Sequence, residues 1–173
     1  MELKEQMDRT VSCAFTGHRP ASLPWGEAED DPRCLALKEK LDKCLKEAYD
    51  AGCRHFLCGM AKGADFYFCE AVIKLRDEHP DIKLEAAVPF PGQSERWSKK
   101  DQERYRALLA QCDLETLIQQ FHSQGCMQRR NRYMVDHAGR LIAVFNGDPR
   151  ASGTLNTIHY AFQQGVKVDV LEV

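Results

Sequence analysis

The sequence has no long apolar stretch and no surplus of positive charge. No run approaches the ~18 apolar residues that a membrane-spanning helix needs. Residues 1–9 are charged and lack the apolar core of a signal peptide. The 24 Lys and Arg residues against 26 Asp and Glu residues leave a formal net charge of −2, without the basic excess of most nucleic-acid-binding proteins. We therefore expect a cytoplasmic protein that contacts neither membrane nor nucleic acid.

Paired-cysteine motifs are also missing, although the chain has eight cysteines. No Cys-x-x-Cys pair occurs, so the spacing of a zinc site or a thioredoxin-like motif is absent. Cys13 and Cys58 stand inside apolar runs of strand length, where cysteine packs as a small hydrophobic residue. We expect eight reduced thiols and no metal site.

Apolar runs of strand length alternate with helical patterns along the whole chain. For example, Leu37, Leu41, Leu45 and Ala48 recur at three- and four-residue steps, which places them on one helix face. This alternation predicts an α/β fold, a Rossmann-like three-layer αβα arrangement with a mainly parallel sheet. With 173 residues, one domain over 1–173 is expected. Strands are expected at 11–16, 54–58, 83–88, 114–118, 140–145 and 166–170, and helices at 34–51, 64–77, 95–110, 127–138 and 153–164.

The loops that follow the strands carry the candidate site residues, because ligands of such folds bind outside the carboxyl ends of the strands. Thr16, Gly17, His18 and Arg19 follow the first strand. Glycine allows a close backbone approach or a positive φ. The Arg19 guanidinium suits a phosphate or carboxylate, and His18 can donate a hydrogen bond or exchange a proton. The alternative is that this segment only turns the chain.

A second glycine-bearing turn follows the second strand, where Gly59 and Gly63 precede a helix that holds Asp65 in its first turn. Free N–H groups at a helix start can hold an anion. The segment is neither a Walker A loop nor Gly-x-Gly-x-x-Gly. Asp65 either caps the helix or contacts a ligand, since a carboxylate is favoured there in both cases.

The remaining candidates lie further along the chain. Ser94 is expected to cap the helix that begins at Glu95. In the first turn of that helix, Glu95 and Arg96 are candidate ligand or oligomer contacts, and Trp97 is expected to pack in the interior. The last strand-to-helix loop holds Gly147, Ser152, Gly153 and Thr154, which form a candidate phosphate cradle; the alternative is a solvated loop with Thr154 as the helix cap. Arg130 and Asn131 lie on the preceding helix, from which they could reach over the sheet edge.

Together these segments resemble the YpsA-like branch of the SLOG superfamily. The resemblance rests on residues 16–20, 59–65, 87–92, 130–136 and 152–154, and it covers nearly the whole chain. It implies a Rossmann-like fold and a pocket for a nucleotide or an NAD- or ADP-ribose-like ligand, with no obligatory cofactor. Members of this branch are associated with stress and cell-division control in Gram-positive bacteria and their mobile elements, and no reaction is settled for them.

The superfamily also includes the Lonely-guy phosphoribohydrolases, which this chain resembles only in part. Their helical Met-x-x-Arg-Lys motif is similar to residues 127–131, with Asn131 in place of the lysine. Their Gly-Thr-x-x-Glu segment is similar to residues 153–157, with Thr157 in place of the catalytic glutamate. Cleavage of an N-glycosidic bond passes through a cation-like state that a carboxylate stabilises, and threonine supplies no such charge.

Three classes of function follow from these observations. The favoured one is a non-catalytic sensor or regulator that binds a nucleotide-derived small molecule, and a homo-oligomer is compatible with it. The second is an N-glycosidase or nucleotide hydrolase that uses a substitute carboxylate, with Asp65, Glu95 and Asp148 as candidates. The third is a DNA-associated protein similar to the DNA-processing proteins of the superfamily, which the charge balance disfavours.

Overall fold

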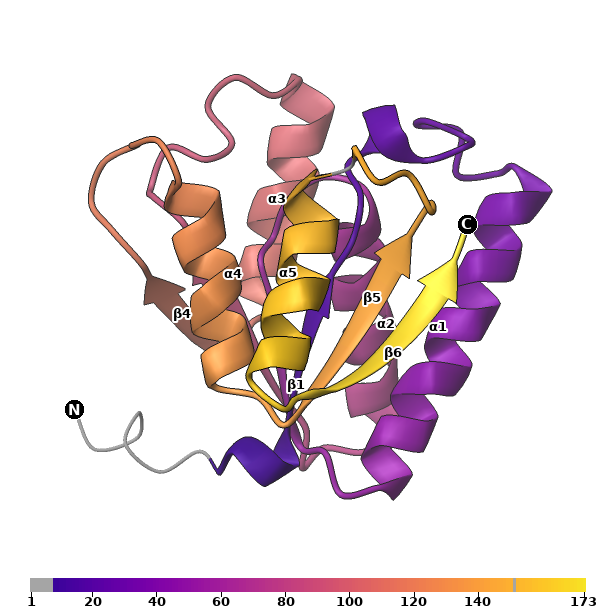
Figure 1. Ribbon diagram of the computed structural model, residues 1–173. Helices are drawn as coiled ribbons and strands as arrows, with labels where there is room; N and C mark the ends of the chain where they lie inside the picture. Colours follow the sequence, from indigo (N-terminus) through magenta and orange to yellow (C-terminus); the bar gives the residue numbers. More distant parts are fainter. Residues whose placement is uncertain (1–7, 151) are drawn as a thin grey trace.

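The computed structural model describes residues 8–150 and 152–173, which contain a single parallel sheet of six strands (Figure 1). The strand order is β4-β3-β2-β1-β5-β6, and every neighbouring pair runs parallel. The predicted α/β, Rossmann-like fold is therefore confirmed. The strands are β1 (Ser12–Thr16), β2 (His55–Cys58), β3 (Lys83–Val88), β4 (Leu114–Leu117), β5 (Arg140–Phe145) and β6 (Lys167–Glu172).

Helices cover both faces of the sheet and complete the three layers. In Figure 1, α4 (Cys126–Asp136) and α5 (Ser152–Gln163) lie in front of the sheet. Behind it lie α1 (Pro32–Asp50), α2 (Ala64–Glu78) and α3 (Lys99–Ala110). Among the helices that the structure describes, none combines the length and the apolar character that a membrane span requires. Residues 1–7, which make up most of the charged N-terminal segment without the features of a signal peptide, lie outside the described residues.

Most predicted elements are present, and the largest boundary error concerns α3. The prediction of a helix from Glu95 with Ser94 as its cap is wrong. Residues 91–97 form turns, and Ser98 caps α3 by accepting a hydrogen bond from the backbone N–H of Asp101. Ser94 directly precedes Glu95, but only Ser98 has an acidic residue, Asp101, three positions later, which is the spacing of a capping box. Thr154 is not a helix cap either, because α5 already begins at Ser152.

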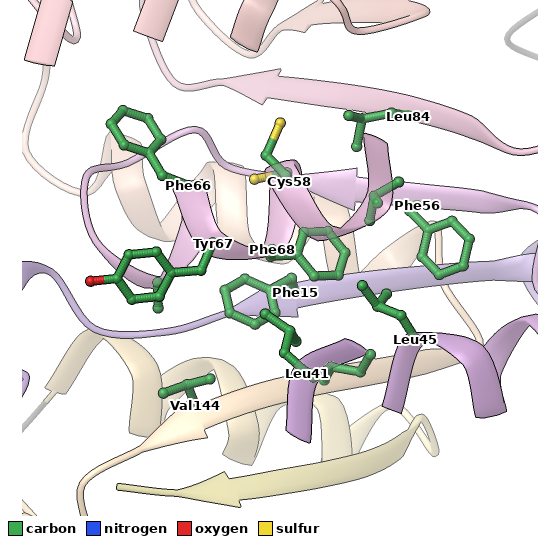
Figure 2. Close-up of a cluster of buried hydrophobic side chains, with 14 of the residues drawn as sticks. Phe15, Leu41, Leu45, Phe56, Cys58, Phe66, Tyr67, Phe68, Leu84 and Val144 are labelled. Carbon is green, nitrogen blue, oxygen red and sulfur yellow. The ribbon is translucent and has the colours of Figure 1, made fainter. Parts of the chain in front are cut away.

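The main hydrophobic core lies between the sheet and helices α1, α2 and α3 (Figure 2). Phe15 of β1 stacks on Phe68 of α2, with ring centroids 4.5 Å apart. The predicted face of α1 is buried against them, including Leu41 and Leu45. Trp97 packs edge-on against Tyr105, as expected. All eight cysteines are free, and all but Cys112 are buried.

The strand order reverses at β1, and this reversal positions the site. The chain leaves β1 toward α1 on one face of the sheet, and it leaves β5, the neighbour of β1, toward α5 on the other face. Two adjacent loops therefore diverge to opposite faces and leave a crevice between them. Such a crevice at the carboxyl ends of the strands is where folds of this type bind ligands.

Candidate functional site

A pocket of about 460 Å³ occupies this crevice, a volume within the range of about 300–1,000 Å³ usual for small-molecule sites. Its walls come from the loop after β1, the start of α2, the helix α4 and the start of α5. The residues that line it are Phe15, Thr16, Gly17, His18, Arg19, Ala21, Ser22, Ala61, Asp65, Met127, Arg130, Asn131, Met134, Arg150, Gly153 and Thr154.

Most of the predicted site residues lie together in this pocket. Those that line it are Thr16, Gly17, His18, Arg19, Asp65, Arg130, Asn131, Gly153 and Thr154. Gly59, Gly63 and Gly147 are not among the residues that line the pocket in the described part of the chain. Ser152 begins α5, but its side chain lies outside what the structure describes.

Two of these glycines hold neighbouring elements close together. A Cβ on Gly59 would lie 2.6 Å from the guanidinium carbon of Arg130. Gly63 has a φ of +87°, and a Cβ there would lie 2.7 Å from the carbonyl oxygen of His18. Gly17 does not have a positive φ, but its Cβ would lie 2.7 Å from that of Ala64. These glycines therefore allow the loop after β1, α2 and α4 to meet at the pocket.

Asp65 does not cap α2, whose start at Gly63 has no side-chain cap, but it binds the turn before the helix and lines the pocket. Its Oδ2 accepts a hydrogen bond of 2.9 Å from the backbone N–H of Ala61, so it braces the turn before α2. It also lines the pocket while being only 6% exposed. Burial raises the pKa of Asp65, and the positive charges of Arg130 and Arg19 oppose that rise.

Arg130 brings a buried positive charge to the same pocket. Its guanidinium donates to the carbonyl oxygens of Gly59 and Ala87, and its Nε donates to Oδ1 of Asn131 at 2.9 Å. Within the described residues it forms no ion pair with a carboxylate, Asp65 included. Burial lowers the pKa of Arg130, and Asp65 opposes that effect. A buried cation and a buried anion therefore face one cavity without being paired to each other.

His18 is held in one tautomer by its backbone partner. The backbone N–H of Asn146 donates to Nε2 of His18 at 3.0 Å, so a neutral ring carries its proton on Nδ1. Nδ1 lies 3.4 Å from the Thr154 hydroxyl. Burial lowers the pKa of His18 below its ordinary value of 6.5, and the charge of Asp148 opposes this. His18 is therefore a hydrogen-bond donor toward the pocket rather than a cation.

We expect the free energy of unfolding to fall as the pH drops from 6.5 through the lowered pKa of His18. In that range the unfolded chain binds a proton that the folded chain does not, so acid favours unfolding. The measurement is urea denaturation at several pH values for the wild type and for His18→Gln, whose amide oxygen can still accept from Asn146. The difference in the free energy of unfolding between the wild type and His18→Gln should become smaller as the pH falls. A difference that does not change with pH would contradict a lowered pKa of His18 in the folded protein.

Residues 146–150, which follow β5, border the pocket beside the loop after β1. Oδ1 of Asn146 accepts from the backbone N–H of Asp148, and its Nδ2 donates to the carbonyl oxygen of Ser22, each at about 3 Å. Asp148 forms an ion pair of 3.1 Å with the exposed Arg150. This segment therefore holds the start of α5 beside the loop after β1.

Of the three candidate substitute carboxylates, Asp65 alone is among the lining residues in the described part of the chain. Glu95 lies against Gly92, and Asp148 is paired with Arg150. The Thr157 hydroxyl donates to the carbonyl oxygen of Gly153 at 2.9 Å, and Thr157 lines a neighbouring groove instead. No group of three His, Cys, Asp or Glu residues suited to a metal ion occurs within residues 8–150 and 152–173.

Sequence reasoning missed several lining residues. Met127 and Met134 of α4 line the pocket, although the sequence pattern did not identify them as site residues. Helical spacing identifies the inward face of α4, but it does not distinguish core from cavity. Ala21, Ser22 and Ala61 carry no chemical signal and reach the pocket through the path of their loops.

The chain matches known proteins over most of its length. The model of the YspA SLOG family matches residues 13–170. A Bacillus pumilus UPF0398 protein is 29% identical over 82% of this chain and 75% of its own length. The UPF0398 protein YpsA of Bacillus subtilis is 27% identical over 82% of this chain and 78% of its own. The SPbeta prophage-derived protein YoqJ, described as uncharacterised, also from Bacillus subtilis, is 32% identical over 76% of this chain and 83% of its own.

Proposed function

This chain belongs to the YspA SLOG family, and from that premise and the geometry of its pocket we propose that it binds a phosphorylated ribonucleoside of the ADP or ADP-ribose type. We further propose that it acts as a sensor or regulator rather than an enzyme. The observation that carries the proposal is the presence of two buried, opposite and mutually unpaired charges, Asp65 and Arg130, in one cavity.

Each charge suits a different part of such a ligand. A buried charge is costly unless a partner compensates it, so an occupant with complementary groups is favoured. The Asp65 carboxylate can accept hydrogen bonds from a ribose diol, and the Arg130 guanidinium can meet an anionic oxygen. A ligand that carries both a diol and a phosphate satisfies the two together.

The phosphates would lie at the start of α5. Gly153 and Thr154 bring the first turn of this helix into the pocket, where its free N–H groups and dipole favour negative charge. Arg19 and Arg150 line the same cavity from two other loops. Both side chains are exposed and can move onto an entering anion.

Arg19→Ala is expected to weaken the binding of ADP-ribose by roughly ten- to a hundredfold without unfolding the protein, because it removes a charge-assisted hydrogen bond of about 1.5–3 kcal/mol. Isothermal titration calorimetry measures the affinity. Arg96→Ala is the matched control, since Arg96 is exposed and does not line the pocket. Equal affinity in both variants would rule out this pocket as the site.

A hydrolase that uses Asp65 is the second candidate, favoured by the presence of this carboxyl in the pocket and by its raised pKa. A carboxyl that is protonated more readily than usual can act as a general acid. We nevertheless expect no release of free base from nucleoside monophosphates in the usual range of roughly 1–10³ per second, because Thr157 supplies no carboxylate.

Chromatography of the bases freed by the purified protein tests this expectation, with Asp65→Asn as the comparison. Wild-type turnover that Asp65→Asn abolishes would assign an enzyme and overturn the non-catalytic proposal. Asp65→Asn should also raise the thermal stability, since the amide keeps the acceptor for the Ala61 N–H and removes a buried charge.

A further inference from the structure

A polar groove of about 360 Å³ continues from the pocket between α4 and α5. Asn131 lines both the pocket and the groove. On α5, Thr154 lines the pocket and Thr157, almost one turn later, lines the groove. The groove therefore begins where the pocket ends, and one elongated ligand can enter both.

The chemistry of the groove differs from that of the pocket. Four of the eight residues that line it carry a carboxamide: Gln128 and Asn131 on α4, and Asn156 and Gln163 on α5. No carboxylate is among the residues that line it in the described chain. Each carboxamide presents a donor and an acceptor side by side, the pairing that Asn and Gln use toward the edge of adenine.

A flat surface lies beside these amides. The guanidinium of Arg132 lies over the ring of Tyr160, 5.1 Å from its centroid. The Tyr160 hydroxyl donates to Asp136 at 2.6 Å, which orients the ring. Guanidinium planes and aromatic rings are surfaces on which nucleobases stack.

We infer that the groove receives the purine base of the ligand whose phosphorylated ribose occupies the pocket. The inference rests on the proposed function and adds a specificity site to it. Asn131 lies at the junction, where its Oδ1 accepts a hydrogen bond from Arg130. Its amide nitrogen donates to none of the residues that the structure describes, so it can donate to the base or the sugar.

Calorimetry with ADP, GDP and UDP tests the inference, because these probes share the ribose diphosphate and differ in the base. We expect the wild type to bind ADP or GDP at least about tenfold more tightly than UDP. The double variant Gln128→Ala with Asn156→Ala should lose roughly tenfold in purine affinity, the equivalent of two ordinary hydrogen bonds, and keep its UDP affinity. Gln164→Ala, exposed and outside the groove, is the matched control.

The outcomes separate this inference from the proposed function. Equal affinity for the three diphosphates, a preference for UDP, or a purine preference that survives in the double variant would each overturn the groove as the base site while the pocket proposal stands. An absence of binding of every diphosphate to the wild type would remove the proposed function itself. Arg19→Ala should weaken all three probes alike, which distinguishes the phosphate end from the base end.

Discussion

Replacing Gly153 with aspartate is expected to weaken ADP-ribose binding by more than about a hundredfold and to leave the protein folded. A Cβ at Gly153 would meet no heavy atom of the described residues within 4 Å, so these residues leave room for a side chain there. The new carboxylate would stand in the first turn of α5, where we place the phosphates. Like charges brought together at a binding site cost several kcal/mol, which corresponds to an effect of this size.

Gly153→Asn is the matched control, because asparagine has nearly the same shape without the charge. Calorimetry on both variants, with circular dichroism to verify folding, separates charge from volume. We expect Gly153→Asn to lose no more than about tenfold, the equivalent of one hydrogen bond. If aspartate and asparagine weaken binding equally, the phosphates do not lie at the start of α5.

Gly63→Ala is expected to lower the free energy of unfolding by about 3 kcal/mol. Two effects contribute, an unfavourable backbone conformation and a steric clash of the new Cβ, and each costs about 1–3 kcal/mol. Gly63 has φ +87° and ψ −127°, a conformation that residues with a Cβ rarely adopt. A Cβ at this position would lie 2.7 Å from the backbone carbonyl oxygen of His18. The same oxygen accepts a hydrogen bond of 3.0 Å from the backbone N–H of Ala64. In a chain of this size the midpoint of thermal unfolding should fall by about 6–12 °C.

Gly165→Ala separates the two causes of that loss. Gly165 also has a positive φ, +71°, but a Cβ there would meet nothing within 4 Å. Its replacement should cost only about 1 kcal/mol, the conformational part alone. Equal losses in the two variants, measured by urea denaturation, would show that the contact between Gly63 and His18 does not constrain the loop after β1.

The candidate site could be predicted in part because parallel strands place all their carboxyl ends at one edge of the sheet. Glycine and polar residues after β1, β2 and β5 were therefore expected to converge, and Thr16, Asp65 and Gly153 do line one pocket. The start of α3 is predicted wrongly because Ser94 stands directly before Glu95. The spacing from Ser98 to Asp101 is that of a capping box, and it identifies the serine that caps the helix in the structure.

The sequence by itself determined the alternation of strands and helices, since hydrophobic periodicity records which face of each element is buried. It also determined which side chains follow each strand. Only the tertiary structure decided that β1 lies beside β5, because strand order depends on crossovers that local pattern does not encode. The same is true of Arg130, which reaches Gly59 across 71 residues and faces Asp65 without pairing with it. The groove between α4 and α5 likewise exists only once those helices pack together, because its walls come from residues that neither helix brings together alone.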